Sequence, residues 1–534
     1  MRLRLLPLAC VATIFMAACS NELPVNNDKD IQAEANTSER TDASVAEFTG
    51  VIASADAGEA ITRSAATYNG KLDFFYTAGD RLWVNNPNAT PALRMDTANN
   101  IAQQLQRGRV NKVARASFYF KGDYVKNRKY TVRYTGNGNP VANRVDIKAV
   151  QTQNKANDAM ELGLNGDCAV GVATYTGSNF DFNLTRSASY ITFAPYNKQG
   201  LVEGMKLKSV KISNPRVAMS GKFAFNDNGI DLNTRPAADA SNKSITLNVN
   251  RFDVPNAVEP TKNASIMVVA PGTYDNVTIE YTLYDPMTKV QKTVTKTLPR
   301  VSFVAGRNYL VTQDMGVTVY GDQYYMWDAN LEFWHGFKHS QPKQNYGQNA
   351  NVPKKYKDQR YFNPVYFNGG TPVYASASAK NCPNVNLAHW FVEMGEASWD
   401  DTAVWGVMGH LYKGGMWVKT EAAIQAKRGN LYPHDLSKET RNGYDFTVTP
   451  LGGEFSRDVT LKGKPANTAD YFFLPAMGFY NAKGRLQKLG VEGYYWTSSP
   501  APGGYHSAYA LRVDANKITL YTSPRDNGFN LWSK

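Results

Sequence analysis

Hydrophobic and polar residues alternate in short runs along the first 315 positions of this 534-residue chain. The clearest run is Val277-Thr-Ile-Glu-Tyr-Thr-Leu283, in which every second residue is apolar, as in a strand with one buried face. Helical periodicity is scarce here, and short strands at this spacing predict β-sandwiches. Further strands are predicted at residues 47–52, 116–120, 130–134, 190–193, 205–212, 245–249, 266–271 and 303–311, and a hairpin-like pair around a Gly-Asp turn at 72–84.

The composition of the chain changes near residue 315. All six histidines lie beyond this point, as do eight of the nine tryptophans, Trp83 being the exception. Short helices are predicted at Ala388–Met394 and Glu421–Lys427. We therefore expect a mainly β protein whose last part is α+β. The predicted domains are residues 46–165, 166–315 and 326–534, with a linker at 316–325.

The first residues form a targeting segment. Arg2 and Arg4 precede an apolar run at residues 5–18, which is too short to span a bilayer as a helix. Met16-Ala-Ala-Cys19 is similar to a lipobox. Residues 1–18 are thus predicted to be a lipoprotein signal peptide, Cys19 the lipidation site and residues 19–45 a polar tether. A plain signal peptide is the alternative.

The net charge bears on the class of partner, and the cysteine content bears on disulfide bonds. The formal net charge of +13 could favour nucleic acid, anionic glycan or acidic matrix proteins. No long basic run and no nucleic-acid-binding motif accompanies this charge, so we expect no nucleic acid partner. Beyond the signal only Cys19, Cys168 and Cys382 remain, which implies no disulfide framework.

Candidate chemistry is sparse. No spacing typical of a hydrolase, zinc protease or nucleotide-binding loop occurs, so an enzyme is not expected. His335 and His339 lie four residues apart but lack an obvious third ligand. Trp399-Asp400-Asp401 could suggest calcium, yet the carboxylate-proline motif of calcium-dependent lectins is missing. We expect no metal and no cofactor.

The C-terminal end carries the most specific pattern. Gly493-Tyr-Tyr-Trp-Thr-Ser-Ser499 precedes two predicted strands, and Arg525 and Gly528-Phe529 follow them. This order, with Phe473-Leu-Pro-Ala-Met-Gly478 upstream, resembles bacterial C-type-lectin-like domains of the FISUMP type. The resemblance implies an α+β C-type-lectin-like fold at 326–534 that recognises ligands on irregular loops.

The loops of this segment supply the candidate ligand-binding residues. Tyr and Arg side chains provide both contact area and hydrogen bonds in recognition surfaces. Trp496 is expected to be structural, and Arg525 could instead be held in an internal ion pair. His506 could be an ordinary surface residue. The candidates are Tyr505, His506, Tyr521, Arg525 and Asn527.

The first half carries a second resemblance. The motifs Tyr190-Ile-Thr-Phe193 and Leu207–Ser213, the segment 267–283 and Phe303–Val311 are similar to Bacteroidales fimbrillins. The resemblance covers roughly residues 46–312 and implies two transthyretin-like β-sandwich domains in a pilus subunit. The set Cys-Pro-Asn … Gly-Gly-Met-Trp at 382–417 also resembles tip proteins of such fimbriae.

Assembly in that family implies removal of a leading strand beside an arginine, followed by addition of a neighbour's strand. An exposed sheet edge favours such a donor strand. Phe48–Ile52 is the expected leading strand. Arg63 is the expected processing site because a cut at Arg40, the alternative, would leave the strand in place.

These resemblances imply a minor, tip-located fimbrial subunit at the cell surface, made as an outer-membrane lipoprotein precursor. Its expected partners are other fimbrial subunits by donor-strand exchange, a host matrix or receptor protein or a glycan, and outer-membrane lipid through Cys19 before processing. The alternative is a surface lipoprotein that binds glycan or protein and never polymerises. An enzyme with an unrecognised site is a third reading.

Overall fold

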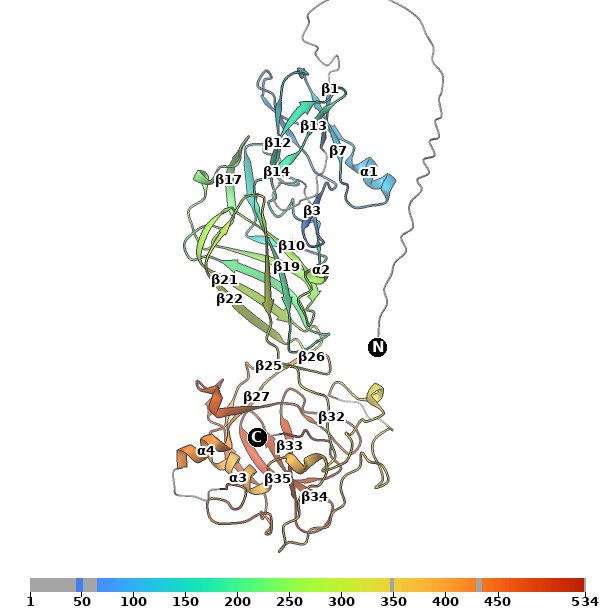
Figure 1. The fold of residues 1–534 in the computed structure, drawn as a ribbon, viewed down its shortest axis with the longest axis vertical. Helices are drawn as coiled ribbons and strands as arrows, with labels where there is room; N and C mark the ends of the chain where they lie inside the picture. Colours follow the sequence, from blue (N-terminus) through green and yellow to red (C-terminus); the bar gives the residue numbers. More distant parts are fainter. Residues whose placement is uncertain (1–44, 51–64, 346–349, 429–434, 533–534) are drawn as a thin grey trace, which may run out of the picture.

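The structure, a computed structural model, describes residues 45–50, 65–345, 350–428 and 435–532. Strands dominate the described chain, so the prediction of a mainly β protein is confirmed. Three bodies follow one another along the long axis, from the blue N-terminal part to the red C-terminal part (Figure 1). Each has its own hydrophobic core. We call them the first, second and C-terminal domains.

The sheet of the first domain has the order β5-β4-β8-β12-β13-β1-β7-β6, with β14 also pairing with β12. Alternate side chains of its strands fill the core; in β8 these include Tyr130 and Val132. Helix α1 (Ile101–Gly108) buries Ile101 against the sheet. The strands are β1 (Val45–Gly50), β4 (Trp83–Asn85), β5 (Leu93–Met95), β6 (Ala98–Asn99), β7 (Ala116–Lys121), β8 (Tyr130–Tyr134), β12 (Ala169–Tyr175), β13 (Phe180–Phe182) and β14 (Leu184–Arg186).

The second domain packs a sheet of order β10-β19-β16-β21-β22 against one of order β20-β15-β23. In β21, Val277, Ile279, Tyr281 and Leu283 are buried and alternate with half-buried residues, as predicted from the sequence. These strands are β10 (Val150–Gln153), β15 (Ser189–Tyr196), β16 (Lys206–Ser213), β19 (Ser244–Asp253), β20 (Ser265–Val269), β21 (Gly272–Tyr284), β22 (Gln291–Phe303) and β23 (Asn308–Asp314).

Smaller elements complete the second domain. Two short sheets have the orders β11-β2-β3 and β18-β17-β9. They are built from β2 (Ala65–Tyr68), β3 (Leu72–Phe75), β9 (Arg144–Ile147), β11 (Asp158–Ala159), β17 (Gly221–Asn226) and β18 (Gly229–Ile230), beside the 3-10 turn η1 (Leu232–Thr234) and the helix α2 (Pro260–Asn263).

The chain passes between these two domains more than once. Strand β10 precedes the predicted boundary at 165/166 but pairs with β19 of the second domain. Strand β12 follows that boundary but pairs with β8 of the first domain. The predicted boundary stays a prediction, but strands from both sides of it enter both domains.

The C-terminal domain combines short helices with small sheets. Helix α3 (Val385–Met394) begins at Asn384, whose side chain accepts a hydrogen bond from Leu387 N, and its residues Val385–Val392 are buried. Helix α4 (Glu421–Arg428) lies where the sequence predicted it. The 3-10 turns are η2 (Lys338–Ser340), η3 (Ser378–Asn381) and η5 (Thr468–Asp470).

The sheets of the C-terminal domain have the orders β29-β24-β27-β30, β28-β35-β34-β33, β25-β26 and β31-β32. Their strands are β24 (Ser398–Trp399), β25 (Val404–Val407), β26 (His410–Lys413), β27 (Gly415–Lys419), β28 (Phe455–Asp458), β29 (Leu461–Lys462), β30 (Tyr471–Pro475), β31 (Phe479–Tyr480), β32 (Leu486–Gln487), β33 (Gly493–Pro500), β34 (Ser507–Val513) and β35 (Lys517–Pro524).

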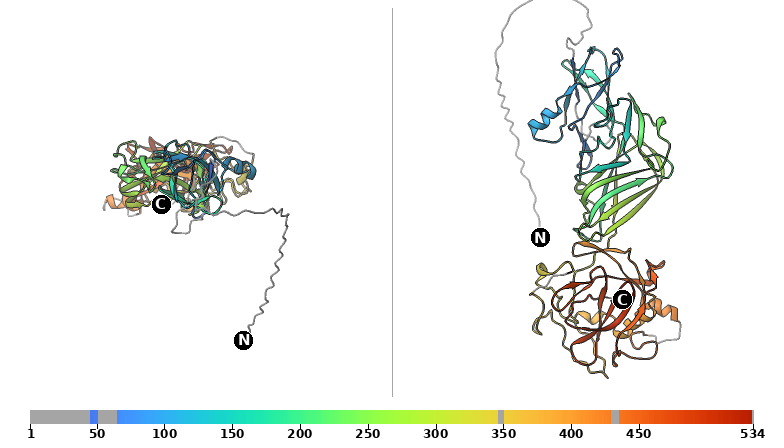
Figure 2. Two further views of the ribbon diagram at one scale, coloured as in Figure 1. Left: turned by 90° about the horizontal axis from the view of Figure 1, so that it is seen from above. Right: turned by 180° about the vertical axis from the view of Figure 1, so that it is seen from behind.

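The hairpin β25-β26 joins the C-terminal domain to the second domain, and the three domains remain in line when seen from behind (Figure 2). Leu411 of β26 is buried in the core of the second domain. The buried carboxylate of Asp285 accepts hydrogen bonds from Leu411 N at 2.9 Å and from His410 Nδ1 at 3.0 Å. Gly204 N donates to the carbonyl oxygen of Gly409 at 2.7 Å. The two domains are therefore docked by packing and by hydrogen bonds.

The segment predicted to be a linker, residues 316–325, is part of the packed structure. Val319 bridges Gly406, and Val317 is buried. Tyr324 is fully buried in the core of the C-terminal domain, and its hydroxyl donates to Met477 O at 2.6 Å. Core residues lie near both ends of this segment, Val317 in the second domain and Tyr324 in the C-terminal domain, and the linker assignment stays a prediction.

Candidate functional site

Two of the predicted ligand-binding residues lie at the tip of a hairpin. Tyr505 and His506 occupy the turn between β33 and β34, and both are exposed. Their ring centroids are 4.2 Å apart. Gly503 and Gly504 precede them with φ angles of 101° and 135°, which side-chain-bearing residues rarely adopt. The two glycines therefore allow the tight turn that presents Tyr505 and His506 to solvent.

Arg525 differs from the expectation of an exposed recognition residue. It is fully buried, and its guanidinium lies 4.3 Å from the ring centroid of Trp327. It donates hydrogen bonds to the carbonyl oxygens of Asn363 at 2.9 Å, Val365 at 2.8 Å and Ser507 at 2.9 Å. Burial lowers the pKa of Arg525 to about 10, and nearby Asp328 opposes that shift. The prediction of an exposed Arg525 is wrong; the arginine instead binds main-chain carbonyl oxygens of two loops.

Tyr521 and Asn527 also turn toward their own domain. Tyr521 is half-buried, burial raises the pKa of its hydroxyl, and Arg512 lies 5.8 Å from its ring centroid. The Asn527 amide donates to Ser523 Oγ at 3.2 Å. Both residues are less available to a ligand than Tyr505 and His506.

The structure adds Tyr366, which the sequence did not single out. Its neighbour Phe367 forms an antiparallel bridge with Gly504, and Gly503 N donates to Phe367 O at 2.9 Å. Phe367 is 1% exposed, whereas Tyr366 is 62% exposed. The signal in the sequence was the absence of Asp, Glu, Lys and Arg from residues 361–379, a run that contains several aromatic residues.

A buried carboxylate fixes the far end of the loop that carries Tyr366. Asp328 is 1% exposed and accepts hydrogen bonds from the main-chain N–H groups of Ser376 at 2.7 Å, Ala377 at 2.7 Å and Ala379 at 3.1 Å. The Asn363 amide, at the near end, donates to the same carboxylate at 2.7 Å. The loop is therefore closed on one internal acceptor.

Trp496 is structural, as predicted. It is fully buried, donates from Nε1 to Tyr325 O at 2.7 Å and stacks on Phe529 with centroids 4.3 Å apart. Cys168 and Cys382 are both buried free thiols.

The candidate metal positions do not come together. His339 lies in the 3-10 turn η2 and His335 precedes it, so the two residues do not share an α-helical face. The Asp400 carboxylate accepts hydrogen bonds from Thr402 N at 3.0 Å and Trp417 Nε1 at 3.2 Å. Within residues 45–50, 65–345, 350–428 and 435–532, no cluster of three or more His, Cys, Asp or Glu could hold a metal ion.

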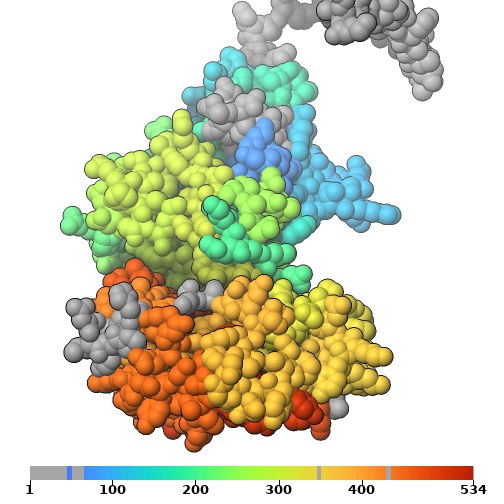
Figure 3. Space-filling model, turned by 60° about the horizontal axis from the view of Figure 1, so that its bottom comes forward, coloured from blue at the N-terminus to red at the C-terminus, as the bar shows by residue number. Residues whose placement is uncertain are grey.

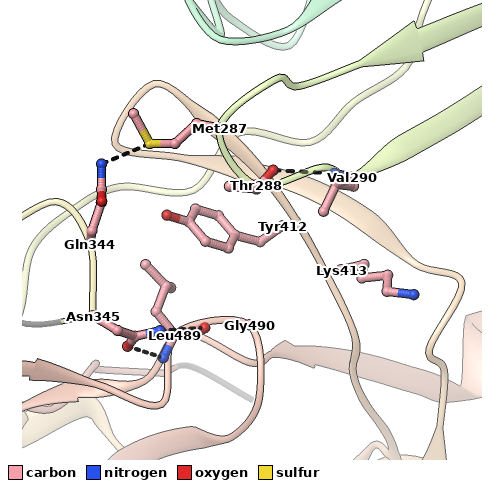
Figure 4. A pocket seen from close by; sticks show the side chains of 9 residues that line it. All are labelled: Met287, Thr288, Val290, Gln344, Asn345, Tyr412, Lys413, Leu489 and Gly490. Carbon is pink, nitrogen blue, oxygen red and sulfur yellow. Dashed lines mark hydrogen bonds between the residues drawn. The ribbon is translucent and has the colours of Figure 1, made fainter.

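A cavity of about 410 Å³ lies between the second and C-terminal domains (Figure 4). The ring of Tyr412 lies among the residues drawn there. Gln344 Nε2 lies 2.8 Å from Met287 Sδ across the joint, and Asn345 exchanges hydrogen bonds with the main chain of Leu489. Its lining residues are Met287, Thr288, Val290, Gln344, Asn345, Tyr412, Lys413, Leu489 and Gly490.

The predicted lipidation and processing residues Cys19, Arg63 and Arg40 lie outside the described residues. The predicted leading strand Phe48–Ile52 lies partly within the described residues, in β1 (Val45–Gly50). In the part of the chain that the structure describes, no helix is long and apolar enough to cross a membrane.

Comparison with known proteins gives structural likeness only. No protein-family profile matches the chain, and no curated protein matches it. A crystal structure of a candidate cell adhesion protein from Bacteroides ovatus is similar at 14% identity and a TM-score of 0.28, covering 50% of this chain and 91% of that one. A counterpart from Bacteroides uniformis is 13% identical, with a TM-score of 0.28, and covers 51% of this chain and 92% of that one.

A fimbrial protein from Bacteroides ovatus covers 89% of this chain and 98% of its own, at 9% identity and a TM-score of 0.21. At these identities and TM-scores the likenesses carry no argument about function.

Proposed function

We propose that this protein is a minor subunit of a surface fimbria that accepts a neighbour's strand in its first domain and adheres through its C-terminal domain. The proposal rests on the position of strand β1. It is the first described element of the chain, yet it lies in the interior of its sheet, between β13 and β7. It pairs parallel with β13 and antiparallel with β7.

The contacts of β1 identify what its removal would uncover. Phe48 is fully buried and stacks on Phe180 with centroids 4.7 Å apart. Phe120, Tyr124 and Tyr130 surround it at 5.1, 5.1 and 6.3 Å. Loss of β1 would leave an aromatic slot flanked by two unpaired strand edges. Such a slot strongly favours an incoming extended segment.

The same chain is poorly suited to donate a strand of its own. Strand β23 pairs with β15 along Asn308–Asp314. The chain then continues through the bridge between Val319 and Gly406 into the C-terminal domain. A subunit that accepts but does not donate ends a fibre, and β1 lies at the opposite end of the molecule from the C-terminal domain (Figure 1). This arrangement supports a tip position with the C-terminal domain outermost.

The proposal includes maturation steps outside the described residues. Cys19 is the attachment point for outer-membrane lipid, and cleavage at Arg63 releases β1 with the tether. We retain the C-type-lectin-like assignment of the C-terminal domain and the transthyretin-like assignment of the first two as parts of this proposal. The chain is taken to recognise, rather than transform, its ligand.

The test is incorporation into fibres. Cells expressing Arg63→Ala should yield sheared surface fibres that lack this protein, because uncleaved β1 keeps the slot filled. Arg300→Ala is the matched control, since Arg300 is an exposed arginine on β22, and it should incorporate like the unaltered chain. Full incorporation of Arg63→Ala, or immunogold labelling along the whole shaft, would contradict the proposal.

The alternative is a surface lipoprotein that binds its ligand but never polymerises. Complete pairing of β1 on both sides favours it, because the intact chain already fills its own slot. This alternative predicts that sheared fibres contain none of the unaltered protein, whereas the fimbrial proposal predicts that they contain it.

A further inference from the structure

Two chain segments beside Arg525 carry no Asp, Glu, Lys or Arg, and the carboxyl group of Asp526 lies close enough to His506 to interact with it electrostatically. Residues 361–379 and 493–511 contain no Asp, Glu, Lys or Arg, although 20% of the whole chain is charged. Tyr366, Tyr374 and Tyr505 on these segments are 62%, 50% and 38% exposed. Figure 3 shows the end of the C-terminal domain, where the yellow-orange and red parts of the chain meet. Exposed aromatic rings without charge are unusual for a solvated loop.

Tyr366 and Tyr505 flank the same main-chain bridge. They are the chain neighbours of Phe367 and Gly504, which face each other across the antiparallel bridge. Successive side chains of an extended segment point to opposite sides. Because Phe367 is 1% exposed and points into the core, Tyr366 points outward. His506, with its ring 4.2 Å from that of Tyr505, extends the same surface.

Arg525 holds the two loops in this arrangement. Its guanidinium binds Asn363 O and Val365 O on one loop and Ser507 O beside the other. Its main-chain N–H donates to His506 O at 2.8 Å. The aromatic pair is thus fixed before a ligand arrives, which reduces the entropy lost on binding. Arg525 is a positioning residue and does not contact the ligand.

We infer that Tyr366, Tyr505 and His506 bind an uncharged saccharide. This inference rests on the proposed adhesive role of the C-terminal domain and names its ligand class. Flat tyrosine rings cover the apolar C–H face of a sugar, while their hydroxyls, His506 and the exposed amide of Asn368 can hydrogen-bond its hydroxyls. An anionic ligand would lose hydration here without gaining an ion pair from these loops. A protein partner typically needs about 800 Å² per side, far more than these few side chains offer.

The test uses the full chain on an array of immobilised neutral, sialylated and sulfated oligosaccharides. The chain should bind at least one neutral oligosaccharide, and Tyr366→Ala and Tyr505→Ala should each weaken that binding at least about tenfold. Tyr356→Ala is the control, because Tyr356 is 60% exposed in the same domain but packs on Tyr361 and Phe362. It should bind like the unaltered chain. Arg525 is left unaltered because its loss would disturb the fold.

Binding restricted to sialylated or sulfated oligosaccharides, or binding to none, would overturn the inference. So would equal loss with Tyr356→Ala, or undiminished capture by a glycoprotein from which the glycans have been removed, which would assign a protein partner. The fibre assay, run on Tyr366→Ala and on the unaltered chain, separates failure of the saccharide inference from failure of the fimbrial proposal. Normal incorporation into fibres, together with no saccharide binding by the unaltered chain, rejects the saccharide inference alone. Absence of the unaltered chain from fibres rejects the fimbrial role.

Discussion

Single residues of the C-terminal domain show how burial changes the role of a side chain. Arg525 follows β35 and its main chain pairs with His506, the neighbour of Tyr505, yet Arg525 is fully buried and Tyr505 is 38% exposed. Arg525 was a candidate ligand contact because arginine provides both contact area and hydrogen bonds. Its position over Trp327 and its carbonyl acceptors make it part of the scaffold instead.

His389 of α3 is a buried histidine that makes the stability of the C-terminal domain depend on pH. Its ring stacks on Phe455 with centroids 3.8 Å apart, and Phe446 lies at 5.6 Å. Glu393 Oε2 lies 3.6 Å from its Nδ1, and Arg441 and Arg457 face that glutamate at 3.9 Å. Burial, aided by the charge of Arg457, lowers the pKa of His389 to about 4.

A histidine whose pKa is lowered by folding takes up its proton more readily in the unfolded chain. Stability from the neutral His389 is therefore complete above about pH 6.5, the ordinary value, and is lost as the pH falls toward 4. We expect the C-terminal domain to lose about 1–3 kcal/mol of unfolding free energy over this window. Denaturant titrations at several pH values, followed by tryptophan fluorescence, measure it.

His389→Gln should remove the loss of unfolding free energy that His389 causes as the pH falls from about 6.5 toward 4. His506→Gln, at an exposed histidine, is the control and should preserve it. An unchanged pH profile for His389→Gln would contradict the assignment to His389.

At the scale of elements, β1 is distinguished by its position rather than by its length. It has six residues, and its buried positions include Phe48 and Gly50. A Cβ on Gly50 would lie 2.3 Å from the Tyr76 hydroxyl, so the strand fits closely against the core. A segment with such shape-specific contacts should bind even when it is no longer covalently attached.

A chain of residues 64–534 should therefore bind a synthetic peptide of residues 44–52. Binding to the folded state raises the melting temperature with peptide concentration. The Phe48→Asp peptide is the matched control, because a carboxylate in the aromatic slot would be buried without a partner, and it should bind at least about tenfold more weakly. Equal stabilisation by both peptides would show that the slot does not select β1. Melting of the first domain reports the difference.

At the scale of the whole molecule, the stability of the C-terminal domain depends on the residue at which it begins. The predicted C-terminal domain starts at residue 326, but the structure places Tyr324 and Tyr325 inside it. Tyr325 exchanges main-chain hydrogen bonds with Phe529 at 2.8 and 2.9 Å, and its carbonyl oxygen accepts from Trp496 Nε1. Phe333 N donates to Tyr324 O at 2.7 Å.

A fragment of residues 321–534 should consequently be more stable than one of residues 326–534. Removal of a buried aromatic side chain and its hydrogen bonds costs about 3–5 kcal/mol. For a domain of this size that corresponds to a melting temperature about 10 °C lower. Leu411, which the second domain covers in the full chain, is exposed in both fragments and does not affect the comparison. Equal melting temperatures would contradict this boundary.

The sequence by itself determined the local features of this protein. The alternation in Val277–Leu283 corresponds to β21, and the helices predicted at Ala388–Met394 and Glu421–Lys427 correspond to α3 and α4. Trp496 was expected in the core and lies there. These features follow from side-chain periodicity and size, which act over a few residues.

Only the tertiary structure decided which distant segments meet. It placed β1 between β7 and β13, inserted Leu411 into the second domain and joined Phe367 to Gly504. It also showed that Arg525, a candidate ligand contact, is buried and binds main-chain carbonyl oxygens of the loops that carry Tyr366 and Tyr505. Strand pairing and burial depend on contacts between residues far apart in the chain, and the local pattern of a segment does not specify its partner.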